Sequence, residues 1–156
     1  MNSLFIKIVL CSSLSLVICS TIVFCSVESI ILWYPTLVKP SWNPPNWVFG
    51  PIWSILYLMI GASFALLWDS THRSNRLAMV LFLAQFILNL FWSIIFFVGR
   101  NVGFAFIEII ILLFLIIATM FIAKRVSLWA TILLVPYLLW VSFAAILTGT
   151  IYFLNL

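Results

Sequence analysis

The chain has 156 residues, of which 67% are hydrophobic and 6% are charged, and its mean hydropathy is +1.35. A typical soluble domain is about half apolar and about a quarter charged, so this composition excludes an ordinary soluble enzyme. The formal net charge of +4 arises from seven basic and three acidic residues. Because the basic residues are scattered by ones and twos and form no patch, nucleic acid is not an expected partner.

The apolar runs are long and continuous, which indicates helices that cross a membrane. Backbone amides in lipid must be satisfied within the chain, so only helices or a closed barrel can span. Barrel strands alternate apolar and polar residues, and no run here does so. One helical crossing needs about 20 residues. We therefore predict an all-α integral membrane bundle of five transmembrane helices, with residues 1–156 as a single domain.

The predicted helices cover residues 4–27, 51–68, 76–98, 102–123 and 128–153. The first run could instead be a signal peptide, but it is too long for one and no small-x-small cleavage site follows it. It contains all three cysteines, Cys11, Cys19 and Cys25. With no CxxC pair and no histidine nearby, they are interpreted as packing residues, and no metal site is expected.

The segment between the first two helices, residues 28–50, is predicted to be irregular, because it holds four of the six prolines and three tryptophans. A loop of this length is often functional, for example as a lid over a site. Pro51 follows it and suits the first turn of the second helix. Pro136 lies inside the fifth helix and is expected to kink it or to free a carbonyl.

The distribution of positive charge predicts the orientation of the chain. Five crossings place five basic residues on the N-terminal side: Lys7, Arg73, Arg76, Lys124 and Arg125. Only Lys39 and Arg100 fall on the other side. Since basic residues concentrate in cytoplasmic loops, we predict a cytoplasmic N-terminus in a bacterial cytoplasmic membrane.

Polar residues within the apolar runs are candidate functional residues, because each is costly without a partner or a cavity. Gln85, Asn89 and Trp92 share one face of the third helix. They either bond to other helices or line a ligand cavity. The aromatic pairs Trp53 with Tyr57 and Tyr137 with Trp140 each share a face too. They are either packing residues or the walls of a pocket for a flat apolar ligand.

Glu108 lies about two turns into the fourth helix. It could serve a proton relay or an ion site. The alternative is a carboxylate near the helix N-terminus, favoured by the dipole, that reaches toward the membrane interface.

Several motifs, which together span nearly the whole chain, match one known family. They are Trp33-Tyr34, Lys39-Pro-Ser-Trp-Asn-Pro-Pro-Asn-Trp-Val-Phe-Gly-Pro-Ile-Trp-Ser-Ile-Leu-Tyr57, Met59-Ile-Gly61, Leu67-Trp68, Gln85 with Leu88-Asn89, Trp92 and Ile95-Phe96-Phe97, and Pro136-Tyr-Leu-Leu-Trp140. On these motifs the sequence resembles the TspO/MBR family, which comprises the tryptophan-rich sensory proteins, the translocator proteins and the peripheral-type benzodiazepine receptors.

This resemblance implies five helices, a homodimer in membrane lipid, and a first loop that caps a pocket for porphyrins or other apolar small molecules. Carried over by position, the ligand-binding residues are Trp33, Tyr34, Asn46, Trp47, Phe49, Trp53, Tyr57, Asn89, Trp92, Tyr137, Trp140 and Phe143. No cofactor is required, since a porphyrin is the ligand or the substrate.

Three functions follow from the resemblance. The first is a receptor or sensor that binds tetrapyrroles. The second is an enzyme that degrades porphyrin with light and oxygen, with Trp53 and Trp140 as electron donors. The third is a transporter of tetrapyrroles or sterols. The animal sterol motif is incomplete here, because Leu147 and Tyr152 are present but no basic residue follows them.

Overall fold

The computed structural model describes residues 3–156, and every regular element in that range is helical. The elements are α1 (Ser3–Glu28), the π-helical turn η1 (Ser29–Trp33), the 3-10 turn η2 (Tyr34–Thr36), α2 (Asn46–Trp68), α3 (Asn75–Ser93), the π-helical turn η3 (Ile94–Val98), α4 (Val102–Ala123) and α5 (Leu128–Leu154). Within residues 3–156, five helical segments are long and apolar enough to cross a membrane. The prediction of an all-α bundle of five helices is confirmed.

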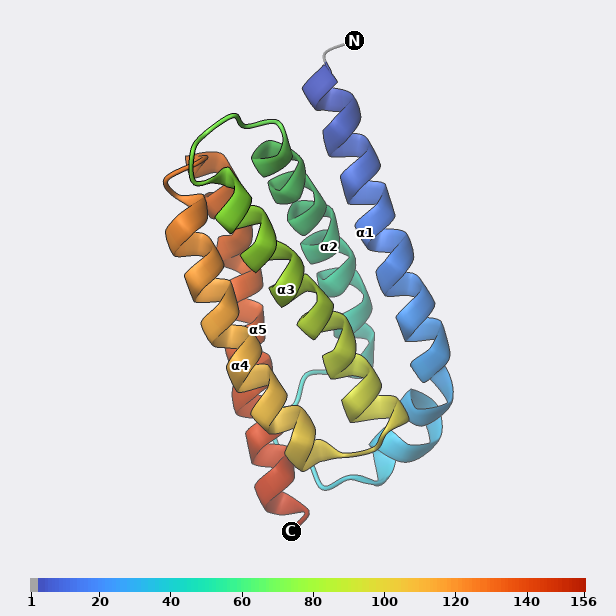
Figure 1. The fold of residues 1–156 in the computed structure, drawn as a ribbon. Coiled ribbons are helices and arrows are strands. Elements are labelled where there is room, and N and C mark those ends of the chain that lie inside the picture. Colours follow the sequence, from blue (N-terminus) through green and yellow to red (C-terminus); the bar gives the residue numbers. More distant parts are fainter. Residues whose placement is uncertain (1–2) are drawn as a thin grey trace.

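The five helices run up and down, so the two termini lie at opposite ends of the bundle (Figure 1). Helix α2 packs between α1 and α5, and α4 packs between α3 and α5. The connection before α2, the turn between α3 and α4, and the C-terminus share one end, which we call the loop end (Figure 1). This topology brings residues 28–45 next to η3 and the C-terminal end of α5, although they are far apart in sequence.

Small residues let α1 approach α2 closely. Ser15 Oγ donates to the Tyr57 carbonyl at 2.6 Å, and Ser12 Oγ donates to the Leu58 carbonyl at 2.9 Å. A Cβ atom added at Gly61 would lie 2.4 Å from the Cα of Ser12. Small side chains and interhelical hydrogen bonds are the usual means of joining helices in lipid.

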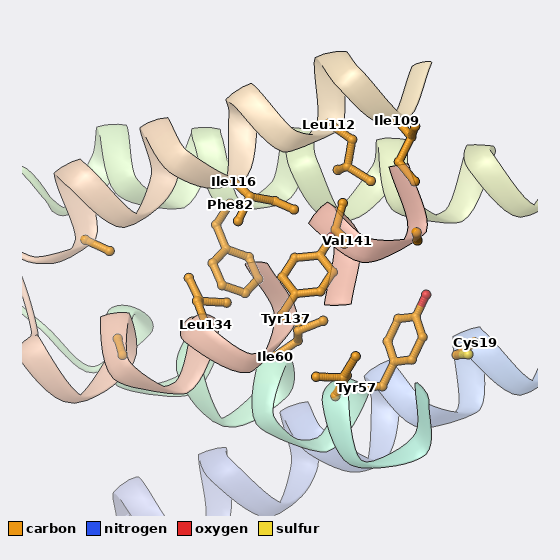
Figure 2. Packing of buried hydrophobic residues seen from close by; sticks show 14 of the residues in the cluster. Cys19, Tyr57, Ile60, Phe82, Ile109, Leu112, Ile116, Leu134, Tyr137 and Val141 are labelled. Atoms are coloured by element: carbon orange, nitrogen blue, oxygen red, sulfur yellow. The ribbon is translucent and has the colours of Figure 1, made fainter. Parts of the chain in front are cut away.

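The core lies between α2, α3, α4 and α5. Figure 2 shows Tyr137, Ile60, Phe82 and Leu134 directed into it from three of these helices. The outward faces carry large apolar side chains, such as the exposed Phe114. In water such a surface would drive aggregation, whereas in a bilayer it is the surface that meets lipid.

The irregular segment is shorter than the sequence predicts. The helical path of α1 continues through η1 and η2 to Thr36, and α2 begins at Asn46, so irregular backbone covers only residues 37–45. Pro51 therefore lies in the second turn of α2, and the prediction that it opens the helix is wrong. Pro45 takes the N-cap position instead, where a missing amide donor costs no helical bond.

Side-chain caps define where α4 and α5 begin. Asn101 accepts from the amide of Phe104 at 2.9 Å, and Ser127 accepts from the amide of Ala130 at 3.3 Å. Arg100 takes a left-handed conformation with φ 49° in the short turn before α4. Helix α5 continues past Pro136 to Leu154.

Candidate functional site

Aromatic rings from α2 and α5 meet inside the bundle near the loop end and form what we call the central cluster. Its members are Phe49, Trp53, Tyr57, Trp140 and Phe143. The ring centroid of Trp140 lies 6.4 Å from Trp53, 5.8 Å from Phe49 and 5.5 Å from Phe143. Tyr57 completes the group at 5.5 Å from Trp53. Because α2 and α5 are antiparallel, two aromatic stripes far apart in sequence arrive at the same depth (Figure 1).

A second group of rings lies nearer the loop end, where both π-helical turns contribute. Phe96 of η3 contacts Trp33 at 5.6 Å, Tyr34 at 6.1 Å and Trp92 at 5.1 Å between ring centroids. Phe97 packs against Phe96 at 4.8 Å. Single π-helical turns are frequent at functional sites, and here they carry aromatic residues from η1 and η3 into contact.

Several buried polar atoms border the rings, and most of them have no partner. Tyr57 donates its hydroxyl to Oδ1 of Asn89, which joins α2 to α3. Among residues 3–156, however, no partner reaches the side chain of Gln85 or the indole N–H of Trp92 or Trp140. An unsatisfied buried group costs about 1–3 kcal/mol. Such a set is what a site for a partly polar ligand would present before the ligand binds.

The three residues that share one face of α3, Gln85, Asn89 and Trp92, therefore differ in their hydrogen bonding. The hydrogen bond from Tyr57 to Asn89 agrees with the interhelical interpretation of this polar face. Gln85 and Trp92 make no such bond among residues 3–156, and their interpretation as a cavity wall stays a prediction.

Residues 37–45 form a lid over the rings. Tyr34 donates its hydroxyl to Oδ1 of Asn43 at 2.9 Å. Lys39 donates to the Tyr34 carbonyl at 2.8 Å, and its ammonium group lies 4.7 Å from the centroid of the Tyr34 ring. Trp42 reaches down to Phe143, with 5.9 Å between ring centroids. The lid is thus attached to η2 at one side and touches the central cluster at the other.

The side chain of Asn155 holds the lid to the end of α5. The amide of Val38 donates to its Oδ1 at 2.9 Å, and its Nδ2 donates to the Val38 carbonyl at 2.9 Å and to the Ile151 carbonyl at 2.8 Å. One amide therefore satisfies both backbone groups of a lid residue, as a neighbouring β-strand would.

The structure brings ten of the twelve predicted ligand-binding residues to the two groups of rings or their border: Trp33, Tyr34, Phe49, Trp53, Tyr57, Asn89, Trp92, Tyr137, Trp140 and Phe143. Asn46 and Trp47 lie apart from them. Because α2 begins at Asn46, its first turn directs both side chains outward, and Trp47 is 74% exposed. An outward tryptophan at a helix end suits the membrane interface.

Three ring residues, Trp42, Phe96 and Phe97, are absent from the predicted ligand-binding residues, although all three lie in the motifs that carry the family resemblance. Phe96 follows Trp92 by four residues, as Trp92 follows Asn89 by three, so helical spacing could have found it. Trp42 carried no such signal, because it lies in the lid.

Glu108 does not reach the membrane interface. It is buried on the inner face of α4, and neither carboxyl oxygen has a partner among residues 3–156. The interpretation as an interfacial carboxylate is therefore wrong, because α4 presents this residue to the bundle and not to its rim.

A separate apolar cavity of about 230 Å³ lies between α1, α2 and α3. None of the predicted ligand-binding residues lines it. Its walls are formed by Cys11, Leu14, Ser15, Ile18, Ile60, Gly61, Phe64, Trp68, Phe82, Leu83 and Phe86.

Comparison with known proteins connects this arrangement to one family. The sequence profile of the TspO/MBR family matches residues 8–154. The chain belongs to the TspO/MBR family. It is 46% identical to the tryptophan-rich protein TspO of Chlorobaculum tepidum, over 79% of each chain. It is also 38% identical to the human translocator protein, over 74% of this chain and 70% of the relative.

A third relative is the tryptophan-rich sensory protein of Cereibacter sphaeroides, which is 33% identical over 72% of this chain and 70% of the relative. Together with the five apolar helices, membership of the TspO/MBR family makes this chain an integral membrane protein. It also supports a membrane receptor or sensor role.

Proposed function

We propose that this member of the TspO/MBR family is a membrane receptor that binds porphyrins and similar flat apolar ligands among the aromatic rings beneath the lid. The observation that carries this proposal is the indole of Trp140. Its ring contacts Trp53, Phe49 and Phe143, and its N–H has no partner among residues 3–156. A flat ligand with acceptor groups at its edge would stack on these rings and accept from this N–H.

A titration in the dark tests the proposal. Purified protein in detergent is titrated with protoporphyrin, and tryptophan fluorescence is recorded. We expect saturable quenching for the wild type and a loss of affinity of at least about tenfold for Trp140→Ala, which removes both the ring and its N–H.

Trp129→Ala is the matched control, because Trp129 lies on the same helix and is 70% exposed. This variant should bind as the wild type does. Quenching that never saturates, or equal affinity for both variants, would contradict a porphyrin site at this cluster.

A second function is favoured by the contact between Trp53 and Trp140, whose ring planes are perpendicular at 6.4 Å. Two adjacent indoles could donate an electron to a photoexcited porphyrin while dioxygen is consumed. For the double variant Trp53→Phe/Trp140→Phe, which retains aromatic rings, we expect binding in the dark to persist and light-dependent loss of the porphyrin absorbance bands to stop.

This second function requires that the porphyrin absorbance bands decay faster with the wild-type protein than with free porphyrin under the same lamp. Decay at the wild-type rate in the double variant would refute the tryptophan mechanism and leave a receptor. Transport stays the third interpretation.

We further propose that the chain forms a homodimer in a bacterial cytoplasmic membrane with its N-terminus in the cytoplasm. Support for the orientation comes from the charges. The end opposite the lid carries Lys7, Arg73, Arg76, Lys124 and Arg125, whereas the loop end carries Lys39 and Arg100.

A further inference from the structure

The cavity between α1, α2 and α3 opens on the outer surface of the bundle, apart from the aromatic rings beneath the lid. Three of the side chains that line it are exposed, Leu14 by 61%, Trp68 by 56% and Leu83 by 46%. Because α1 packs chiefly on α2, a furrow remains between α1 and α3, with α2 as its floor. We call this furrow the α1–α3 groove. In a bilayer it faces the lipid tails.

The walls of the α1–α3 groove are apolar. The ring of Phe64 packs on those of Trp68 and Phe82, with 6.2 and 5.3 Å between ring centroids. The one hydroxyl group in the lining, that of Ser15, already donates to the Tyr57 carbonyl at 2.6 Å. Among residues 3–156, no lining side chain has a buried nitrogen or oxygen atom without a partner. The groove therefore suits a hydrocarbon chain and offers no hydrogen bond to a polar ligand.

The dimensions of the groove also favour a single acyl chain. Its volume is about 230 Å³, and a helix of a second copy, which is about 10 Å wide with its side chains, could not enter it. Lys7 precedes the lining residue Cys11 by four positions, so both share one face of α1. Ile18, at the other end of the lining of α1, lies about 16 Å from Lys7 along the helix. Half of the hydrocarbon core of a bilayer is about 15 Å thick, so the groove extends through one leaflet.

The mouth of the groove carries positive charge. It lies at the end of the bundle opposite the lid, where α1 and α3 begin and α2 ends (Figure 1), and we call this the basic end. Lys7 Nζ lies 5.8 Å from the ring centroid of Trp68 and 2.7 Å from Oδ1 of Asp69. That ion pair uses one of the three donors of the ammonium group. Arg76 lies two turns before Leu83, on the face of α3 that lines the groove. Two cations and one carboxylate leave a net positive charge at the depth of the lipid headgroups.

We propose that the α1–α3 groove binds one anionic phospholipid of the leaflet at the basic end, with an acyl chain in the groove and the phosphate accepting from Lys7 and Arg76. The apolar walls hold any acyl chain. The two cations favour a headgroup with a net negative charge over a zwitterionic one, whose own ammonium group offsets its phosphate. None of the predicted porphyrin-binding residues lines this groove, so the inference is independent of the proposed function.

Native mass spectrometry of the delipidated protein in detergent tests the inference. Palmitoyl-oleoyl phosphatidylglycerol and palmitoyl-oleoyl phosphatidylcholine, which share both acyl chains, are titrated separately. The dissociation constant of the first bound lipid is recorded for each. We expect the wild type to bind phosphatidylglycerol more tightly by about fivefold or more, because basic residues near the membrane surface attract anionic headgroups.

Two variants separate the charge at the mouth from the ion pair. Lys7→Gln and Asp69→Asn both break the pair, but only Lys7→Gln removes a cation. We expect Lys7→Gln to weaken phosphatidylglycerol binding by about fivefold and to leave phosphatidylcholine binding unchanged. Asp69→Asn should bind phosphatidylglycerol at least as tightly as the wild type. Equal losses in both variants would overturn the inference, because they would show that the ion pair acts through the structure.

A third variant fills the groove itself. Leu83→Trp adds bulk at the exposed rim, and Ile117→Trp is its control, because Ile117 is similarly exposed, at 48% against 46%, and lies on α4 away from the groove. We expect Leu83→Trp to weaken the binding of both lipids by about tenfold, since the acyl chain loses its place. Ile117→Trp should bind both lipids as the wild type does. Equal lipid binding by these two variants would contradict a site in the groove.

The same spectra give the mass of the protein and therefore its oligomeric state. If a second copy covers the groove, Leu83→Trp should convert dimers into monomers without weakening lipid binding, and that result would overturn the inference. So would equal affinity of the wild type for the two lipids, or lipid binding that does not saturate.

Discussion

Gly61 shows how a single position governs the contact between α1 and α2. The backbone of Ser12 and Cys11 passes so close that an added Cβ would lie 2.4 Å from the Cα of Ser12 and 2.5 Å from the carbonyl oxygen of Cys11. Both obstacles are backbone atoms, so no side chain can rotate away. A larger residue would have to move the whole helix.

We expect Gly61→Ala to destabilise the protein by about 1–3 kcal/mol, the usual cost of overpacking. Thermal unfolding in detergent should show a lower midpoint. Ser54→Ala is the matched control, because Ser54 lies exposed in the same helix and its hydroxyl bonds to the Gly50 carbonyl of that helix. Alanine has the higher helix propensity, so an equal fall in both variants would contradict the close-contact explanation.

At the scale of elements, the lid is held by few contacts. Residues 37–45 have no regular structure of their own. Their hydrogen bonds to the end of α5 are the two between Val38 and Asn155, and Asn155 is itself fixed by a third bond to the Ile151 carbonyl. Asn155 is exposed, so these bonds add little to global stability. Their effect should instead be local, because they determine how often the lid leaves the rings beneath it.

Asn155→Ala should therefore accelerate hydrogen exchange in a peptide that covers residues 37–45 and leave the unfolding midpoint nearly unchanged. Exchange measured by mass spectrometry checks this, with Thr150→Val as control, because Thr150 bonds only to Ile146 of its own helix. If exchange in the lid is the same in all three proteins, Asn155 does not anchor it.

At the scale of the whole molecule, the lid follows the first crossing and therefore lies at the end of the bundle opposite the basic end. Lys7 and Asp69 form an ion pair at 2.7 Å, which confirms that the start of α1 and the loop after α2 share one end. With both side chains at least 30% exposed, this pair adds little stability. The ion pair shows instead which segments share an end of the bundle, and this arrangement makes the orientation of the chain in the membrane testable.

Single cysteines introduced into a cysteine-free variant should react with a thiol reagent according to the side of the membrane on which they lie. Ser41→Cys lies in the lid and Thr71→Cys lies in the loop after α2, and both positions are exposed. With a membrane-impermeant maleimide on intact bacteria, we expect Ser41→Cys to react and Thr71→Cys to react only after permeabilisation. The reverse pattern would place the N-terminus outside and the lid in the cytoplasm.

Much of the site could be predicted from helical spacing, whereas the segment before α2 offered no such spacing. Trp53 with Tyr57, Asn89 with Trp92, and Trp140 all lie on inner faces, as expected. Asn46 and Trp47 do not, since their directions depended on whether α2 begins at Asn46 or Pro51. Proline content predicted an irregular segment but could not say that only residues 37–45 would be irregular.

The sequence by itself determined the class of the protein, because continuous apolar runs in lipid permit only helices, and their lengths allow five crossings. Only the tertiary structure decided which polar atoms find partners. Asn89 accepts a hydrogen bond from Tyr57, whereas the side chains of Gln85, Glu108 and Trp140 have no partner in the part of the chain that the structure describes. Helical spacing assigns a residue to a face, but a hydrogen bond depends on where the neighbouring helices place their own groups, and that is set by packing of the whole bundle.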